Sequence, residues 1–387
     1  MSMMPDLRLD PYPWYTEMLR TSPVVFSPEF GCYLVFRAED VRKVMQDANL
    51  FSSAIFDGLS TEMPFEHQLT GMDPPRHTQL RSLAAHAFTP KAVKDLEPEI
   101  VRIVNRYIDM MLERKDADFV RDFAIPFPIE VISAMLGVPD ADRSRFKQWS
   151  DTIVEISERL LTGAPELPAH VAIYKEMLQY FGYLLEERQR NPQEDLISRL
   201  ALAEIGGQRL SSVEAGHFCT LLMVAGNETT TNLLTNAIRT FAEYPDQWQL
   251  LRQNPKLIPQ AVEEVMRYRT SVQIMYRVAK KDTVLSGVFI PAGKRVAVFL
   301  GAANRDPAKF ERPDEFDITR TPGAHLTFGH GIHFCLGAPL ARLEISTALK
   351  AMLGRVSSFT IPPERELEPL TGMNLLGLKR LPIRFES

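Results

Sequence analysis

The sequence is poor in cysteine. Its 387 residues include only three, Cys32, Cys219 and Cys335, and no two of them form a C-x-x-C pair. Such an odd and sparse set argues against a disulfide framework and a c-type haem attachment site, and it favours a reducing cytoplasm. Folding needs no stabilising disulfide or metal, because a chain of this length can bury roughly three quarters of its unfolded surface.

Long apolar runs and an excess of one charge are also missing. The longest apolar stretches, such as residues 296–300, are far shorter than the roughly 18 residues of a membrane span. Lys and Arg number 44 against 49 Asp and Glu, a formal net charge of −5, which argues against nucleic acid as the partner. No secretory signal is expected, since the first residues lack a basic segment before an apolar core. Without repeats or low-complexity tracts, we expect one compact body.

Helical periodicity dominates the rest of the chain. A short strand is expected at 32–36, and a hairpin is expected from strands at 284–290 and 295–300 around a turn at 291–293. Segments 51–72 and 162–168 lack a period, which leaves open whether they are plain surface loops or coverings that gate a site. The expected helices are 38–47, 76–87, 91–114, 141–160, 170–190, 212–243, 258–268 and 338–354.

The helix expected at 212–243 contains a conflict. Residues 211–214 (S-S-V-E) form a capping-box pattern, and both flanks are apolar nearly all round, which is typical of a buried helix. Its centre nevertheless contains Gly226, which costs about 1 kcal/mol relative to Ala, and the carboxylate of Glu228. Either this centre faces an exposed groove, or the helix opens locally. An opening would let a flat group approach Ala225 and Gly226 while Glu228 and Thr229 handle protons.

Cys335 lies in the most distinctive segment of the sequence. Gly329, Gly331 and Gly337 surround it and allow tight backbone geometry, and a helix is expected directly after it. Amide groups and the dipole at a helix N-terminus stabilise a thiolate. Such a thiolate serves either as a nucleophile, with His330 or His333 as its base, or as an axial metal ligand. Cys32 and Cys219 are expected to be inert core residues.

Three motifs together resemble the cytochrome P450 monooxygenases of the soluble bacterial kind. The pattern F-x-x-G-x-H-x-C-x-G at 328–337 resembles the haem-binding loop, A-G-x-E-T-T at 225–230 the oxygen-activation motif, and E-x-x-R at 264–267 the family's ion pair. Their order and spacing match, and the resemblance covers essentially the whole chain. It implies one cytochrome P450 domain over 1–387, mainly α with minor β. That fold is a triangular helical body with a small β-rich region, and its haem is buried between the long central helix and the cysteine-loop helix.

The resemblance implies haem b (iron protoporphyrin IX) as the cofactor, with the Cys335 thiolate as axial ligand and metal ligand, and O2 as co-substrate. A thiolate ligand pushes electron density onto iron and favours O–O cleavage. Gly337 belongs to the binding loop, and Ala225 to the helix that the haem would approach. Where this chain has His333 the family often has Arg, so a propionate contact there would be weaker and pH-sensitive. The positions that match the family's propionate ligands are His77, Arg81, Arg277 and His333.

The resemblance also implies roles on the oxygen side. Thr229 would hydrogen-bond dioxygen at the iron, and Glu228 would relay protons. Many relatives carry Asp at the Glu228 position, and the longer arm here would alter the relay without abolishing it. A structural role is expected for the buried charge network of Glu264, Arg267 and Arg320, which would hold the cysteine loop.

The implied activity inserts one oxygen atom of O2 into a C–H bond, by hydroxylation or epoxidation, in a cytoplasmic monomer. The substrate would be a small hydrophobic molecule such as a polyketide, steroid, terpene or fatty acid, because the implied pocket is mostly apolar. That pocket would be lined by 51–72, 160–170, 224–225, 273–275 and 374–377.

Electrons are expected from a separate ferredoxin and ferredoxin reductase, since no flavin or iron–sulfur module is visible in the sequence. The donor would dock near Cys335, where Arg102, Arg106, Arg342 and Lys350 are candidate contacts or ordinary surface residues. Two alternatives stay open. A haem-binding sensor or carrier without turnover would not need Glu228 and Thr229. A cysteine hydrolase would be colourless and gives no reason for His77, Arg81 and Arg277.

Overall fold

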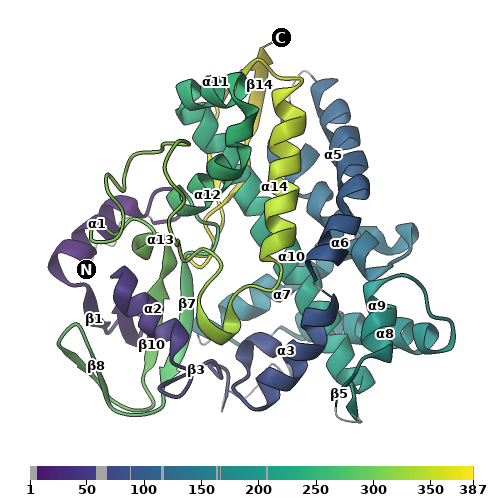
Figure 1. Ribbon diagram of the computed structural model, residues 1–387. Helices are drawn as coiled ribbons and strands as arrows, with labels where there is room; N and C mark the ends of the chain where they lie inside the picture. The colour runs from purple at the N-terminus through teal and green to yellow at the C-terminus, as the bar shows by residue number, and fades with distance from the viewer. Residues whose placement is uncertain are drawn as a thin grey trace. The chain divides into compact units, whose positions relative to one another are not determined.

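The computed structural model describes residues 7–57, 68–87, 89–114, 117–162, 164–165, 167–205 and 208–386. Its contacts divide the chain into two compact units. Figure 1 labels helices and strands along the chain. The first, here called the sheet unit, comprises Met1–Ser52, Val101–Pro126 and Thr229–Ser387. The second, here called the helical unit, comprises Ser53–Ile100 and Phe127–Glu228.

The sheet unit is organised around a five-stranded sheet in the order β1-β2-β10-β7-β3. β2 (Cys32–Val35) pairs antiparallel with β1 (Val24–Ser27) and parallel with β10 (Arg295–Phe299). β10 pairs antiparallel with β7 (Ile274–Ala279), and β7 with the two-residue strand β3 (Phe51–Ser52). The sheet therefore places the N-terminal strands β1 and β2 beside strands from the second half of the chain.

The central strand β10 is buried on both faces. Val296 and Val298 enter one hydrophobic cluster, whereas Ala297 and Phe299 enter another, as the two-residue period of a strand requires. In this unit α12 packs against α14, as Figure 1 shows. Its helices are α1 (Tyr12–Thr21), α2 (Ala38–Gln46), most of α5 (Glu97–Leu112), α11 (Pro245–Gln253), α12 (Ile258–Tyr268), α13 (Leu300–Ala303) and α14 (Ala338–Leu353).

Short elements complete the sheet unit. β8 (Thr283–Leu285) and β9 (Val288–Ile290) form a hairpin, and β14 (Pro382–Glu386) joins β11 (Ser358–Thr360) to β4 (Ala117–Asp118). The remaining ones are the strands β12 (Glu368–Pro369) and β13 (Leu378–Arg380) and the short helices η3 (Val120–Ala124), η5 (Pro255–Leu257) and η6 (Gly331–His333).

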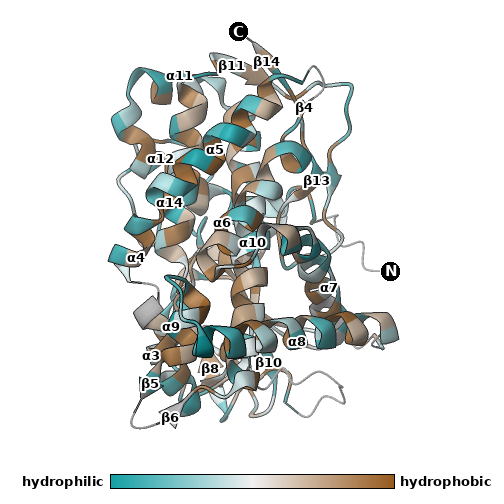
Figure 2. Ribbon diagram, turned by 90° about the vertical axis from the view of Figure 1, so that its right-hand side faces the viewer, coloured by the Kyte–Doolittle hydropathy of each residue, from teal (hydrophilic) through white to brown (hydrophobic). Residues whose placement is uncertain are grey.

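The helical unit is built on α8, which packs against both α7 and α9. Val171, Tyr174, Met177 and Phe181 are buried at helical spacing along α8, and Figure 2 shows both hydrophilic and hydrophobic residues along this helix. The elements of this unit are η2 (Leu69–Gly71), α3 (Arg76–Ala87), α4 (Pro90–Asp95), α6 (Pro126–Leu136), η4 (Asp140–Asp142), α7 (Arg143–Thr162), α8 (Pro168–Arg190), α9 (Leu196–Leu202), β5 (Glu204–Ile205) and β6 (Gln208–Arg209).

Helix α10 (Ser212–Glu243) contributes to both units, because the division falls between Glu228 and Thr229. Its 32 residues span about 48 Å at 1.5 Å per residue. The capping box is confirmed: the Glu214 amide donates to Ser211 Oγ at 3.2 Å, and the Ser211 amide donates to Glu214 Oε2 at 3.1 Å. Among the described residues, none of the helices combines the length and apolarity needed to cross a bilayer.

The predicted local opening of α10 is wrong, because the α-helix continues through its polar centre. A Cβ atom added to Gly226 would lie 3.3 Å from Ile132 Cδ1 of α6, so this glycine makes room for a neighbouring helix. Ala225 is exposed, while the residues on either side of it are buried or half-buried. The alternative interpretation, a polar centre that faces an exposed groove, is not confirmed either, because Asn227 and Thr230 are buried and Glu228 is half-buried.

Two further predictions are corrected. The hairpin closes within the run expected to be one strand, since Ser286 and Gly287 both adopt positive φ and turn β8 into β9. β10 instead joins the main sheet, where an apolar strand is buried on both faces. The helix expected at 91–114 breaks at Leu96, because Pro98 in the first turn of α5 cannot supply the amide that a continuous helix needs.

The other predicted helices and the strand at 32–36 are confirmed within a few residues. Of the two aperiodic segments, residues 58–67 and residues 163 and 166 lie outside the described part of the chain. Within the first segment the structure contains β3 and the short helix η2.

Candidate functional site

Cys335 lies at the end of a loop in which two positions require glycine. Gly329 and Gly331 have φ of +72° and +74°, and a Cβ atom at Gly331 would lie 2.7 Å from the Met45 carbonyl oxygen of α2. The Cys335 amide donates to the Phe328 carbonyl at 2.8 Å, which closes the loop just before Gly337, the N-cap of α14. The loop thus rests on α2 and presents the cysteine at the start of a long helix.

The three cysteines differ in accessibility. Cys335 is exposed, whereas Cys32 and Cys219 are buried. Burial raises the pKa of Cys32 to about 11 and raises the pKa of Cys219 further. Both therefore stay protonated core thiols, and Cys335 is the cysteine that can meet a ligand.

The predicted propionate ligands are distributed over both units. Arg277 on β7 is 3% exposed, and its Nη1 donates to the Tyr276 carbonyl at 2.7 Å. His333 is half-buried in η6, within the cysteine loop of the same unit. In the helical unit, His77 and Arg81 lie one turn apart on α3, with His77 almost fully buried. Four positions matched by the resemblance thus carry cationic or ionisable groups that are at least partly buried.

Glu228 occupies a polar position within the helical unit. Its Oε1 accepts a hydrogen bond from Ser150 Oγ of α7 at 3.2 Å and from its neighbour Asn227 Nδ2 at 3.4 Å, and Lys147 Nζ lies 3.9 Å away. Burial raises the pKa of Glu228, while Lys147 and Ser150 act in the opposite direction. A raised pKa brings this carboxyl group closer to the range in which a side chain both takes up and releases a proton.

Thr229 begins the part of α10 that belongs to the sheet unit, and it is half-buried. The two threonines after it, Thr230 and Thr231, are buried. Thr231 Oγ1 donates to the Ala124 carbonyl at 2.9 Å, a bond that ties the helix to η3. Thr231 therefore serves the packing of the helix.

The predicted network of Glu264, Arg267 and Arg320 is confirmed, whereas its expected hold on the cysteine loop stays a prediction. Arg267 donates to both carboxylate oxygens of Glu264 at 2.8 Å, and Arg320 Nε donates to Glu264 Oε1 at 3.2 Å. The guanidinium of Arg267 also donates to the carbonyls of Asn304, Pro313 and Glu315. Arg267 and Glu264 are each 2% exposed, so the network is a buried structural element.

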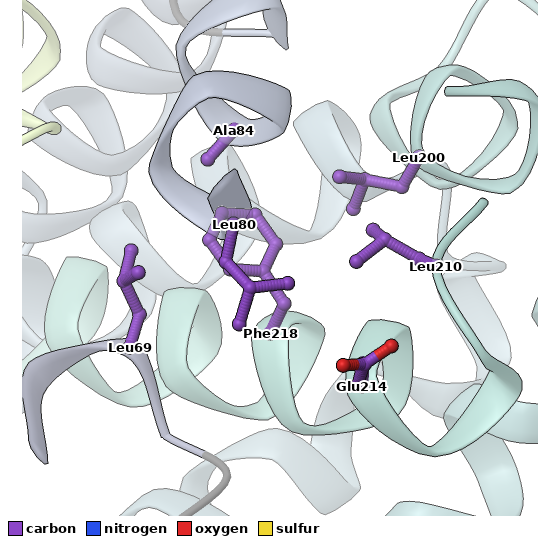
Figure 3. A pocket seen from close by; sticks show the side chains of 7 residues that line it. All are labelled: Leu69, Leu80, Ala84, Leu200, Leu210, Glu214 and Phe218. Carbon is purple, nitrogen blue, oxygen red and sulfur yellow. The ribbon is translucent and has the colours of Figure 1, made fainter. Parts of the chain in front are cut away.

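The described residues also line hollows in both units. A groove of about 460 Å³ beside the cysteine loop is lined by residues that include Arg42, Lys309, His330 and Phe334. There His330 Nε2 accepts from Arg42 Nε at 3.2 Å, and burial and Arg42 lower the pKa of His330. In the helical unit, the apolar cavity of Figure 3 encloses about 10 Å³, room for roughly one water.

That smaller cavity carries no free polar group. Among the seven side chains of Figure 3, the one charged group is Glu214, and its carboxylate is engaged by Arg76 and by Ser211 Oγ at 2.9 Å. The cavity is therefore a packing feature of the helical unit.

Sequence reasoning placed most of the candidate residues but missed their partners. Lys147 and Ser150 approach Glu228 from α7, about 80 positions earlier in the chain, and no sequence pattern links them. Glu263 binds His325 and Arg342 on either side of the cysteine loop, and its one sequence signal is its place next to Glu264. Such pairings depend on tertiary packing.

Comparison with known proteins agrees with these features. The family model for cytochrome P450 matches residues 31–386. A putative cytochrome P450, YjiB of Bacillus subtilis, is 42% identical over 97% of this chain and 94% of its own length. Erythromycin C-12 hydroxylase of Saccharopolyspora erythraea is 38% identical over 96% of this chain and 93% of its own.

Solved structures show the same fold. The crystal structure of CYP109E1 from Bacillus megaterium in complex with testosterone has a TM-score of 0.88 and 38% identity, and the match covers 98% of this chain and all of that one. An exposed cysteine in a glycine-framed loop, the confirmed Glu-Arg-Arg network and these chain-length matches lead to one conclusion. The chain belongs to the cytochrome P450 family, the haem-thiolate monooxygenases.

Proposed function

We propose that this enzyme holds haem b through the thiolate of Cys335 and inserts one oxygen atom of O2 into a C–H bond of a small hydrophobic substrate. The observation that carries the proposal is the exposure of Cys335 at the start of α14, while the other two cysteines are buried. We also propose that the 387 residues act as one domain, because a single family model spans residues 31–386.

The side chains present fit such a cofactor. A thiolate is a soft ligand suited to haem iron, and the glycine frame leaves it uncovered. Propionates need cations, which His77, Arg81, Arg277 and His333 would supply, and Arg offers two parallel donors to a carboxylate. Gly337 and the following amides at the start of α14 would moderate the charge on sulfur, and Ala225 leaves space on α10.

When bound, the haem supplies two-electron activation of O2. Around it, the protein's own task is to manage protons. Glu228, whose pKa burial raises, would take up a proton from the side of Lys147 and Ser150. The hydroxyl of Thr229, the next residue of α10, would pass it on and hold the co-substrate by hydrogen bonding. These roles make Glu228 and Thr229 the catalytic residues of the proposal.

The substrate and the electron donor are proposed by chemistry. The named relatives include one bound to testosterone and one called an erythromycin hydroxylase, which supports a hydrophobic substrate of steroid, polyketide, terpene or fatty-acid type. A ferredoxin with its reductase would deliver electrons at the groove beside the cysteine loop. Arg42 and Lys309 are exposed there, and Arg102, Arg106 and Lys350 are exposed elsewhere in the same unit. Arg342 is less available, since Glu263 already binds it.

The absorption spectrum of the reduced, CO-bound protein tests the ligand. A long-wavelength Soret band is expected for the wild-type protein, and Cys335→Ala should abolish it while Cys32→Ala leaves it intact. A colourless protein after expression with ample porphyrin supply would refute the proposal and return the cysteine hydrolase to consideration.

A second experiment separates turnover from mere haem binding. Thr229→Ala should keep its haem but consume reducing equivalents without forming an equal amount of product, whereas Thr229→Ser should restore coupling. Full coupling in Thr229→Ala would remove the catalytic assignment. If neither Thr229→Ala nor Glu228→Gln changed the wild-type behaviour, a sensor or carrier would describe the protein better.

A further inference from the structure

One carboxylate joins the two limbs of the cysteine loop. Glu263 on α12 accepts hydrogen bonds from Arg342 Nε at 2.6 Å and Arg342 Nη2 at 2.9 Å, and His325 Nε2 lies 3.1 Å from its Oε2. His325 precedes Cys335 by ten residues and Arg342 follows it by seven. Both ends of the loop segment are therefore attached to the same side chain of α12.

The incoming limb is held in a defined register. The Thr327 amide donates to His325 Nδ1 at 3.4 Å, so the ring proton lies on Nε2 and is donated to Glu263. Asn304 Oδ1 accepts from the Leu326 amide at 2.6 Å, and Thr327 Oγ1 donates to the Met266 carbonyl of α12 at 2.8 Å.

The outgoing limb connects Glu263 to the cysteine itself. The Arg342 guanidinium carbon lies 4.5 Å from the centroid of the Phe328 ring, and the Phe328 carbonyl accepts the hydrogen bond from the Cys335 amide. A guanidinium fixed by two bonds to Glu263 thus packs on the residue that closes the loop. Movement of Arg342 would release Phe328 and, with it, the backbone of Cys335.

The charge of this carboxylate persists over the working pH range. Burial acts to raise the pKa of Glu263, but hydrogen bonds from Arg342 and His325 prevail and lower it to about 2. The neighbouring network of Glu264, Arg267 and Arg320 has another task, because it ties α12 to the carbonyls of residues 304, 313 and 315. Glu263 is therefore the acidic residue of α12 that reaches the cysteine loop.

We propose that Glu263 is a positioning residue that, through Arg342 and Phe328, holds Cys335 in the orientation in which its thiolate stays bound to haem iron. This inference rests on the proposed role of Cys335 as the iron ligand. Removal of the carboxylate leaves the sulfur in place but loosens the loop that carries it. The expected consequence is easier loss of the thiolate bond and a changed reduction potential.

The test is Glu263→Gln in the haem-loaded enzyme. Glutamine keeps the shape but presents one acceptor oxygen, which cannot serve both Arg342 and His325. In mild denaturant, the long-wavelength Soret band of the reduced CO complex should disappear about tenfold faster than in the wild-type protein, within the range found for partners of metal ligands. The reduction potential should also shift.

Glu243→Gln is the matched control. Glu243 accepts from two guanidinium groups, Arg239 at 2.9 Å and Arg269 at 2.8 Å, at the end of α10 and outside the loop. It should keep the wild-type spectrum, decay rate and potential even if its melting temperature falls. If Glu263→Gln behaved like this control, Glu263 would be an ordinary structural residue and the proposal would be overturned.

Arg342→Lys is the second variant, for the case in which Glu263→Gln does not fold. It keeps the charge but loses the bidentate bond and the flat contact with Phe328. A decay rate between those of wild type and Glu263→Gln, or several-fold above wild type if that variant is lost, supports the proposal, and wild-type decay contradicts it. Absence of the long-wavelength band in the wild-type enzyme would instead overturn the assignment of Cys335.

Discussion

Glu264 and Glu228 are two largely buried carboxylates with opposite surroundings. Glu264, 2% exposed, accepts hydrogen bonds from two nitrogens of Arg267, from Arg320 and from the Asp317 amide. Glu228, 15% exposed, accepts from a hydroxyl and an amide group, with its nearest cation at 3.9 Å, and burial raises its pKa. A carboxylate that accepts hydrogen bonds from this many donors serves structure, whereas burial with fewer donors raises the pKa of a carboxyl group and suits it to proton exchange.

The largest effect is expected from removing Arg267, the main hydrogen-bond donor to Glu264. Arg267→Ala leaves Glu264 buried and three carbonyls without their donor, so unfolding should cost about 3–5 kcal/mol less than in the wild-type protein. Denaturant titration and haem content measure the loss. The exposed pair of Arg20 and Glu17 provides the control: Arg20→Ala should cost less than about 1 kcal/mol. Equal losses would contradict the ranking.

The next largest effect is expected from neutralising Glu228, the carboxylate with fewer hydrogen-bond donors. Glu228→Gln removes the exchangeable proton without creating a cavity, so product formation should fall about 100-fold while folding and haem loading stay at wild-type levels. Product analysis and the CO-complex spectrum measure the two separately. Undiminished product formation would show that protons reach the site without Glu228.

Glu344 adds a third carboxylate with fewer donors still. It lies buried on α14, its Oε2 has no hydrogen-bond partner among the described residues, and burial raises its pKa well above the usual value. The folded protein then keeps a proton that the unfolded chain releases. Stability should therefore fall as pH rises above the unfolded value of 4.5, by up to about 1.4 kcal/mol per pH unit from this group.

Glu344→Gln should flatten that decline. The measurement is the free energy of unfolding of the haem-loaded enzyme between pH 5 and 8 (roughly the range that proteins tolerate best). Parallel pH dependences of variant and wild type would mean that Glu344 is ionised in the folded protein.

The smallest effect is expected from removing Lys147, whose charge acts on the pKa of Glu228. The charge of Lys147 lowers the pKa of Glu228. Lys147→Met removes this charge, so the pKa of Glu228 and the pH limb that reports it should move upward. The shift should stay below about one pH unit, since the partly exposed ammonium is screened by solvent. The pH profile of product formation measures it. An unchanged profile would show that Lys147 does not act on Glu228, and a downward shift would contradict the expected sign.

The comparison also separates what could be predicted. The E-x-x-R pair was predictable because residues three apart share a helix face, and Arg320 was placed as their third partner through the family resemblance. The surroundings of Glu228 were not, since Ser150 and Lys147 come from a helix about 80 residues earlier. The predicted opening of α10 failed for a related reason: Ile132 fills the space beside Gly226, and a helix packed so closely does not unwind.

The sequence alone therefore predicted the features that depend on neighbouring residues. The glycines around Cys335, the capping box of α10 and the periods of the helices rest on backbone geometry and on contacts a few residues apart. Folding alone decided where β10 pairs and that Glu263 reaches both limbs of the cysteine loop. These features depend on contacts between distant segments, whose energies come from burial and packing that no short stretch of sequence contains.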